Sequence, residues 1–244
     1  MKDISKHSLA NLWPSGIVTL GILFALKGGG NRAFYRWLSR EWRPLFPALP
    51  ERTRFFRLLA THREWAEGFL ATPSVVGVVE SYGVALLHPM REGRSRQQIG
   101  RKGTSNQRWI VGGKLWVLLN KLGLVVAWDC AGANAPDTAF PPLIEPYEDE
   151  RIVLSDSAFQ AQVGDPANIK FCERGLWHTR RLIETVLSLV TGVGHRKKVA
   201  HRTWAAFQTR LAFTLATFNL LVQWHGLKPD ARGFIHLSLA EFSL

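Results

Sequence analysis

Cysteine is scarce in this sequence, and long hydrophobic runs are absent. Only Cys130 and Cys172 occur among the 244 residues, and no histidine stands at a spacing from them that would suggest zinc. A reducing cytoplasm is the default compartment for so few cysteines. The most apolar run, residues 16–26, has 11 residues, whereas a helix needs about 20 to span a bilayer. No small-residue cleavage site follows that run, so the sequence predicts a cytoplasmic protein without a membrane partner.

Acidic residues are also few compared with basic ones. The chain has 31 Lys+Arg against 19 Asp+Glu, a formal net charge of +12, and its hydrophobic content of 46% is that of a folded protein. Such an excess of positive charge favours a polyanionic partner, and without a membrane segment we expect nucleic acid. The alternative is a basic surface that serves only solubility.

The basic residues gather in two segments. Residues 88–121 hold eight Lys and Arg against the single acid Glu92, and residues 170–210 hold nine against Glu173 and Glu184. Contacts from such residues to phosphates position DNA without reading its sequence. The residues that we expect to contact DNA are Arg91, Arg94, Arg96, Arg101, Lys102, Arg108, Arg180, Arg181, Lys197 and Lys198.

Residues 1–70 carry helical patterns. We expect one helix over residues 15–26, ended by three glycines, a second over 31–42, and a third after Pro50. These helices predict a basic N-terminal subdomain that contacts DNA or pairs two protomers. The alternative is a plain helical bundle with a basic face.

From residue 71 the pattern changes to strands. Strands are expected over residues 75–84, 108–120, 124–128 and 151–154, with a helix over 137–147 before the last strand and helices over 177–190 and 202–224 after it. Three hairpin-linked strands, followed by a fourth that returns parallel beside the first, are typical of a ribonuclease H-like α/β fold. We therefore expect residues 71–244 to form a ribonuclease H-like catalytic domain, a mixed sheet flanked by helices.

Two carboxylates follow apolar strands in this arrangement. Glu80 comes after a run of valines and Asp156 comes after the strand 151–154, so neighbouring strands would place them about 4.8 Å apart. Carboxylates at that spacing repel unless a cation lies between them, which predicts a divalent metal site. Glu184, at the edge of the apolar stripe of the helix 177–190, would be a third ligand. The alternatives are a solvated strand end for Glu80 and a surface ion pair for Glu184.

Three segments resemble the acidic motifs of insertion-sequence DDE transposases. They are residues 80–83 (ESYG), 156–159 (DSAF) and 180–187 (RRLIETVL). Trp177, Arg180 and Glu184 match the aromatic, arginine and glutamate of the family's third motif, while Thr191 stands where that motif has lysine. The family has aspartate at the first position, where this chain has Glu80.

The resemblance implies a DNA transposase that cleaves and joins strands at insertion-sequence ends. Glu80, Asp156 and Glu184 would be the catalytic residues and would hold two Mg²⁺ or Mn²⁺ ions. The expected partner is double-stranded DNA, both transposon end and target, bound by a homodimer associated with a prokaryotic nucleoid. No covalent intermediate with the enzyme is implied.

Two alternatives remain open. Glutamate is longer than aspartate by one methylene, roughly 1.5 Å, so a decayed or repurposed transposase that binds DNA without cutting is the second hypothesis. A ribonuclease H-like nuclease acting on RNA–DNA hybrids or junctions is the third. Asp129, at the end of the third strand, is expected too far from Glu80 to replace it, and Asp137 and Asp165 are expected to be cap and turn residues.

Overall fold

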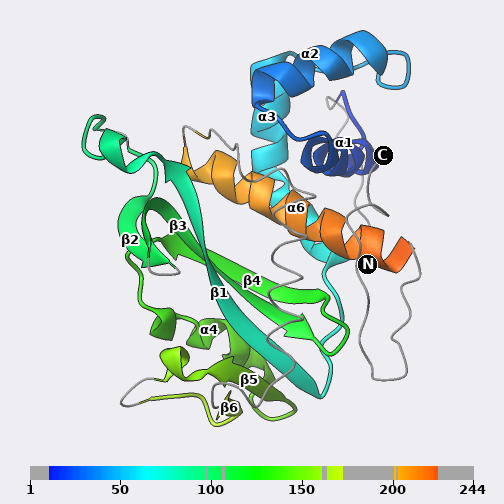
Figure 1. The fold of residues 1–244 in the computed structure, drawn as a ribbon. Coiled ribbons are helices and arrows are strands. Elements are labelled where there is room, and N and C mark those ends of the chain that lie inside the picture. Colours follow the sequence, from blue (N-terminus) through cyan, green and yellow to red (C-terminus); the bar gives the residue numbers. More distant parts are fainter. Residues whose placement is uncertain are drawn as a thin grey trace.

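The fold was obtained as a computed structural model, which describes residues 11–96, 98–105, 108–160, 164–172, 201 and 203–224. It is a mixed α/β fold with N-terminal helices, a curled mixed sheet and a long C-terminal helix (Figure 1). The long helix crosses one face of the sheet, and short helices cover the other face. Among the described residues, none of the helices is long and apolar enough to cross a membrane.

The first two N-terminal helices match their predicted ranges to within one residue, and the third begins after Pro50 as predicted. They are α1 (Pro14–Lys27), α2 (Asn31–Glu41), α3 (Arg52–Thr61) and the 3-10 helix η1 (Arg63–Phe69). Pro14 lies in the first turn of α1, where its missing N–H costs nothing, and Gly28 ends the helix with a φ of 69°. The Glu51 carboxylate caps α3 by accepting the N–H groups of Thr53 and Arg54.

The long helix α6 (Trp204–Trp224) is buried on two faces. The predicted apolar stripe, which includes Leu211 and Leu215, is confirmed and packs on the sheet. A second stripe, with Ala212 and Phe213, packs against the N-terminal helices and was not predicted. The same helix therefore contributes to the core of the sheet and to the core of the helical layer.

A buried arginine lies where α6 meets α1. Arg210 is 3% exposed, and its guanidinium lies 4.1 Å from the ring centroid of Phe24. Burial lowers the pKa of Arg210 to about 10, because desolvation disfavours the charged form. The aromatic ring offers its negative face to this cation.

The sheet has six strands in the order β2-β3-β1-β5-β6, with β4 also paired to β3. β1 and β4 run antiparallel to β3, whereas β5 is parallel to β1 and β6 is parallel to β5. The predicted parallel return of the fourth strand beside the first is thus confirmed. The strands are β1 (Val76–Leu87), β2 (Arg101–Ser105), β3 (Arg108–Asn120), β4 (Val125–Gly132), β5 (Ile152–Asp156) and β6 (Ile169–Cys172).

Several details of the sheet differ from the predictions. β1 continues to Leu87, so Glu80 lies inside the strand and not at its end, because β3 pairs with β1 over nearly its whole length. Asp129 likewise lies inside β4. β2 and β6 were not predicted, since short strands of five and four residues carry little periodic signal.

The predicted helix over residues 137–147 is not continuous. Its place is taken by a 3-10 turn, η3 (Asp137–Ala139), the four-residue α4 (Pro141–Ile144) and a second 3-10 turn, η4 (Glu145–Tyr147). Pro141, Pro142 and Pro146 lack the N–H that a continuing helix requires. The predicted helix over 177–190 lies outside the described residues.

Candidate functional site

Glu80 and Asp156 lie at the same level of two neighbouring parallel strands. The ladder between β1 and β5 ends with the pair Val78 and Leu154, and each acid is two residues further along its strand. Side chains alternate between faces, so Glu80 shares the face of Val78 and Asp156 shares that of Leu154. Both of those residues belong to the core on the α6 side of the sheet. The two acids therefore occupy one row and one face.

Both acids remain partly exposed to solvent beyond the point where the strands stop pairing. Glu80 and Asp156 are both half-buried. The N–H of Ser81 donates to Glu80 Oε1 at 3.2 Å, and the hydroxyl of Ser157 donates to Asp156 Oδ1 at 3.0 Å.

The donor set fits a hard divalent cation. Two partly exposed carboxylates supply oxygen ligands, which Mg²⁺ and Mn²⁺ prefer. The predicted third ligand, Glu184, lies outside the described residues. Within the part of the chain that the structure describes, no three His, Cys, Asp or Glu residues come together in a group that could hold a metal. Of the three predicted ligands, Glu80 and Asp156 are the two that the structure describes.

Asp129 belongs to a different surface. It pairs with Trp116 across β4 and β3, and Trp116 belongs to the core on the α4 side of the sheet. Glu80 instead pairs with Val117, which belongs to the core on the α6 side. Because paired residues share a face, Asp129 and Glu80 lie on opposite faces of the sheet, and β3 separates their strands.

A polar cluster that the sequence did not predict lies on the α4 side, directly behind Glu80. Asp137 Oδ1 lies 3.1 Å from the ammonium of Lys114 and accepts the hydroxyl of Ser81 at 2.6 Å. The side chain of Lys114 is only 10% exposed. Asp137 was expected to be a cap residue. The sequence feature that could have predicted this cluster is Lys114, the one charge inside the apolar run of β3. A buried lysine requires a partner of opposite charge.

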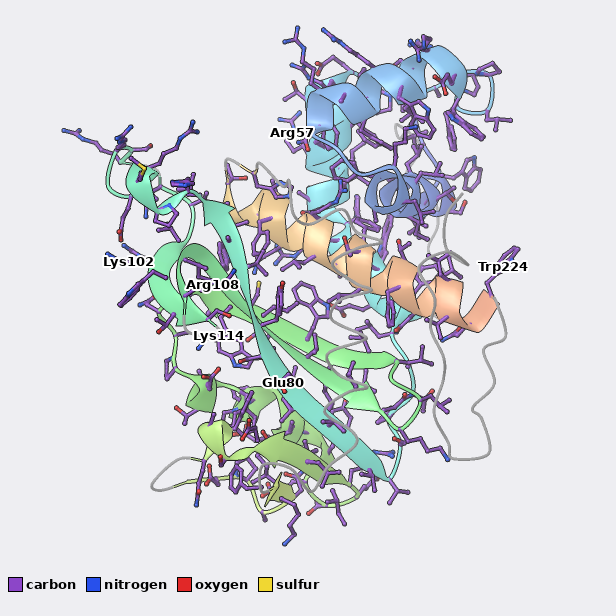
Figure 2. The ribbon with its side chains drawn as sticks, in the orientation of Figure 1. Arg57, Glu80, Lys102, Arg108, Lys114 and Trp224 are labelled. Carbon is purple, nitrogen blue, oxygen red and sulfur yellow. The ribbon has the colours of Figure 1, made fainter. Side chains whose placement is uncertain are left out.

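The six predicted DNA contacts that the structure describes are all exposed. They are Arg91, Arg94, Arg96, Arg101, Lys102 and Arg108, on the segment before β2, on β2 itself and at the start of β3. Figure 2 shows Lys102 and Arg108 together at one edge of the molecule, away from Trp224 at the far end of α6. The other four, Arg180, Arg181, Lys197 and Lys198, lie outside the described residues.

An open cleft adjoins this basic edge. Its volume is about 760 Å³, and its lining includes Arg96, Gln98, Arg101, Thr203 and Trp204. One wall is the segment before β2, and the other is the start of α6. In the part of the chain that is described, neither Arg96 nor Arg101 takes part in an ion pair. Their charges are available to a ligand in the cleft.

The chain was compared with protein-family models, curated proteins and solved structures. None of them matches it.

The exposure of Trp109 was not predicted from the sequence. Trp109 is 63% exposed, although tryptophan usually buries most of its surface. It follows Arg108 at the start of β3 and pairs with Thr104 of β2. In the sequence, Trp109 stands between Arg108, which opens β3, and the buried residues that follow. This position next to a charged residue is the feature from which its exposure could have been predicted.

Proposed function

We propose that this protein is a metal-dependent enzyme that cleaves and joins DNA strands in the manner of a DDE transposase. Glu80 and Asp156 would be two of its acidic metal ligands and Glu184 the third. The shared row and face of Glu80 and Asp156 at the end of the β1–β5 ladder is the observation that carries the proposal.

The strand pairing supports a ribonuclease H-like assignment of the fold. Antiparallel β1, β3 and β4, with β5 parallel beside β1, correspond to the four strands that this assignment requires. β6 adds a fifth strand parallel to β5. In such a sheet the first and fourth strands bring their acidic residues to one place, although those residues are far apart in sequence.

The chain's own side chains would have separate roles. Glu80 and Asp156 would hold one or two divalent ions by their carboxylate oxygens, with Ser81 and Ser157 orienting those oxygens by hydrogen bonds. A bound divalent ion would supply the Lewis acid that phosphodiester cleavage and strand transfer require. The exposed arginines and lysine of residues 91–108 would hold the DNA backbone.

The proposed partner is double-stranded DNA, at a transposon end and at a target. Pairing two ends would require a homodimer on DNA, and the protein would be cytoplasmic and bound to the nucleoid. The helices of residues 11–69 present a further set of exposed arginines for this purpose, among them Arg57 on α3 (Figure 2).

Substitution of Asp156 tests the proposal. Asp156→Asn is expected to abolish Mg²⁺-dependent cleavage of DNA that carries the element's ends, because the amide removes a negative ligand of the cation. Binding of the same DNA should persist. The matched control is Asp129→Asn, which removes an exposed carboxylate on the opposite face of the sheet and should leave cleavage unchanged. Undiminished cleavage by the Asp156 variant would exclude the proposed site.

A second candidate function is DNA binding without cleavage. The observation that favours it is the glutamate at position 80, whose carboxylate reaches about 1.5 Å further than an aspartate would. Placement of two cations tolerates a fraction of that distance. Absence of cleavage in the wild-type protein, with DNA binding intact, is the result that would distinguish this candidate.

A further inference from the structure

Trp109 lies beside an exposed lysine of the neighbouring strand β2. The ammonium of Lys102 lies 5.3 Å from the centroid of the Trp109 ring, which is a cation–π contact. Because 63% of the surface of Trp109 is exposed, its indole ring remains accessible to a flat group such as a base. Arg108, its neighbour in the chain, is also exposed, on the other face of β3.

The indole and the cleft beside α6 are connected through one ion pair. Lys102, which contacts the Trp109 ring, also lies 3.4 Å from a carboxylate oxygen of Glu92. Glu92 in turn lines the cleft, together with Arg96 and Arg101. The ammonium of Lys102 therefore lies between the exposed indole and one edge of the cleft.

We propose that this surface binds single-stranded DNA, with one unpaired base stacked on Trp109 and adjoining phosphates against Arg96 and Arg101. This proposal rests on the proposed function, which identifies the ligand as DNA. It adds that a single-stranded segment of the DNA substrate binds at this surface. Duplex DNA presents phosphates and sugars outward and keeps its base faces stacked, so an indole gains little from it. An unpaired base exposes a π-face, and a cationic groove with an aromatic platform is the usual design of proteins that bind single strands.

An acidic protein segment is the alternative occupant. It would satisfy the arginines equally well, because carboxylates and phosphates are both bidentate partners of guanidinium groups. It would not require a base to stack on the indole. Competition by poly-glutamate therefore distinguishes the two occupants.

The test measures binding of a fluorescein-labelled oligothymidylate and of a labelled duplex by anisotropy, in EDTA. Trp109→Ala is expected to weaken single-strand binding about tenfold, in line with the loss of one base stack, and duplex binding by less than about twofold. Trp109→Phe should recover most of the loss, because phenylalanine keeps an aromatic face. The matched control is Trp224→Ala, which removes another exposed tryptophan, 81% exposed and remote from the basic edge (Figure 2).

Three results would overturn the proposal. They are unchanged single-strand binding by Trp109→Ala, an equal loss for single strand and duplex, and displacement of the oligonucleotide by poly-glutamate as readily as by unlabelled single strand. Because EDTA removes divalent ions, binding is measured apart from cleavage. Undiminished cleavage by Asp156→Asn, together with a selective loss of single-strand binding in Trp109→Ala, would refute the proposed catalytic site alone. Loss of cleavage in Asp156→Asn, together with unchanged single-strand binding in Trp109→Ala, would refute the single-strand surface alone.

Discussion

The ammonium of Lys114 and the carboxylate of Asp137 form a largely buried ion pair, 3.1 Å apart, that joins β3 to the connection between β4 and β5. Asp137 also accepts the hydroxyl of Ser81, the residue after Glu80. The connection that returns the chain to β5 is therefore anchored directly behind one of the candidate metal ligands.

Removing the acid of this pair should destabilise the fold. Asp137→Ala is expected to lower the free energy of unfolding by about 2 kcal/mol, less than the 3–5 kcal/mol of a fully buried pair, because the Asp137 side chain is 33% exposed. Urea unfolding measures the change. Asp129→Ala, at an exposed position, is the control and should stay within about 0.5 kcal/mol of wild type. Equal stability of the two variants would show that Lys114 needs no anchor.

Two glycines of α1 should respond to alanine in opposite ways. A methyl group on Gly21 would overlap the ring of Phe213, whereas one on Gly16 meets nothing within 4 Å. We expect Gly21→Ala to cost about 1–3 kcal/mol through overpacking between α1 and α6. Gly16→Ala should add about 0.5–1 kcal/mol, because alanine favours the helix. Thermal unfolding of both variants gives the comparison, and a stabilised Gly21 variant would contradict the close approach of the two helices.

Glu92 should weaken the binding of nucleic acid. Its carboxylate pairs with Lys102, and the two side chains are 36% and 48% exposed. Exposed pairs of this kind are worth about 0.2–1 kcal/mol, so Glu92→Gln is expected to tighten single-strand binding by up to about fivefold. Anisotropy titrations at low salt measure the gain, which should shrink as salt screens the charges. A weaker affinity in this variant would mean that Glu92 itself contributes a contact.

The arginines of the cleft are expected to bind DNA through contacts with its phosphates. Arg101→Gln is expected to reduce the slope of log affinity against log salt by about 0.7 for single-stranded DNA, the value for one phosphate contact. A titration series over salt concentration measures the slope. Lys121→Gln removes an exposed positive charge in the turn between β3 and β4, outside the cleft, and serves as the control. If both variants lower the slope equally, the change in slope is caused by the lower net charge of the protein and not by loss of a phosphate contact in the cleft.

Glu80→Asp should separate the two candidate functions. If the protein is a competent enzyme adapted to glutamate, shortening this ligand should lower cleavage by at least about tenfold, since metal placement tolerates far less than the lost 1.5 Å. If the protein has decayed, the same substitution should raise cleavage. Cleavage assays with Mg²⁺, compared with Glu80→Gln, give the answer; no change in either variant would remove Glu80 from the site.

Much of the fold was predictable from local pattern. Gly28 ends α1, and the prolines near residue 50 break the chain that follows α2. β3 is a long apolar run with Lys114 as the one charge inside it. The short strands β2 and β6 were missed because their pairing partners, and not their own residues, make them strands. The second face of α6 was missed for the same reason, since Ala212 and Ala216 become core residues only when α1 packs against them.

The amino-acid sequence by itself determined the positive charge, the helical and strand segments and the two acids that follow apolar residues, because each depends on composition or on periodicity along the chain. Tertiary structure alone decided that Glu80 lies inside a strand, that it shares a row and face with Asp156 and that Asp129 faces away. It also paired Lys114 with Asp137 and left Trp109 exposed beside Lys102. These relationships join residues that are distant in sequence, and they depend on the register and the face of each strand in the sheet, which local patterns do not specify.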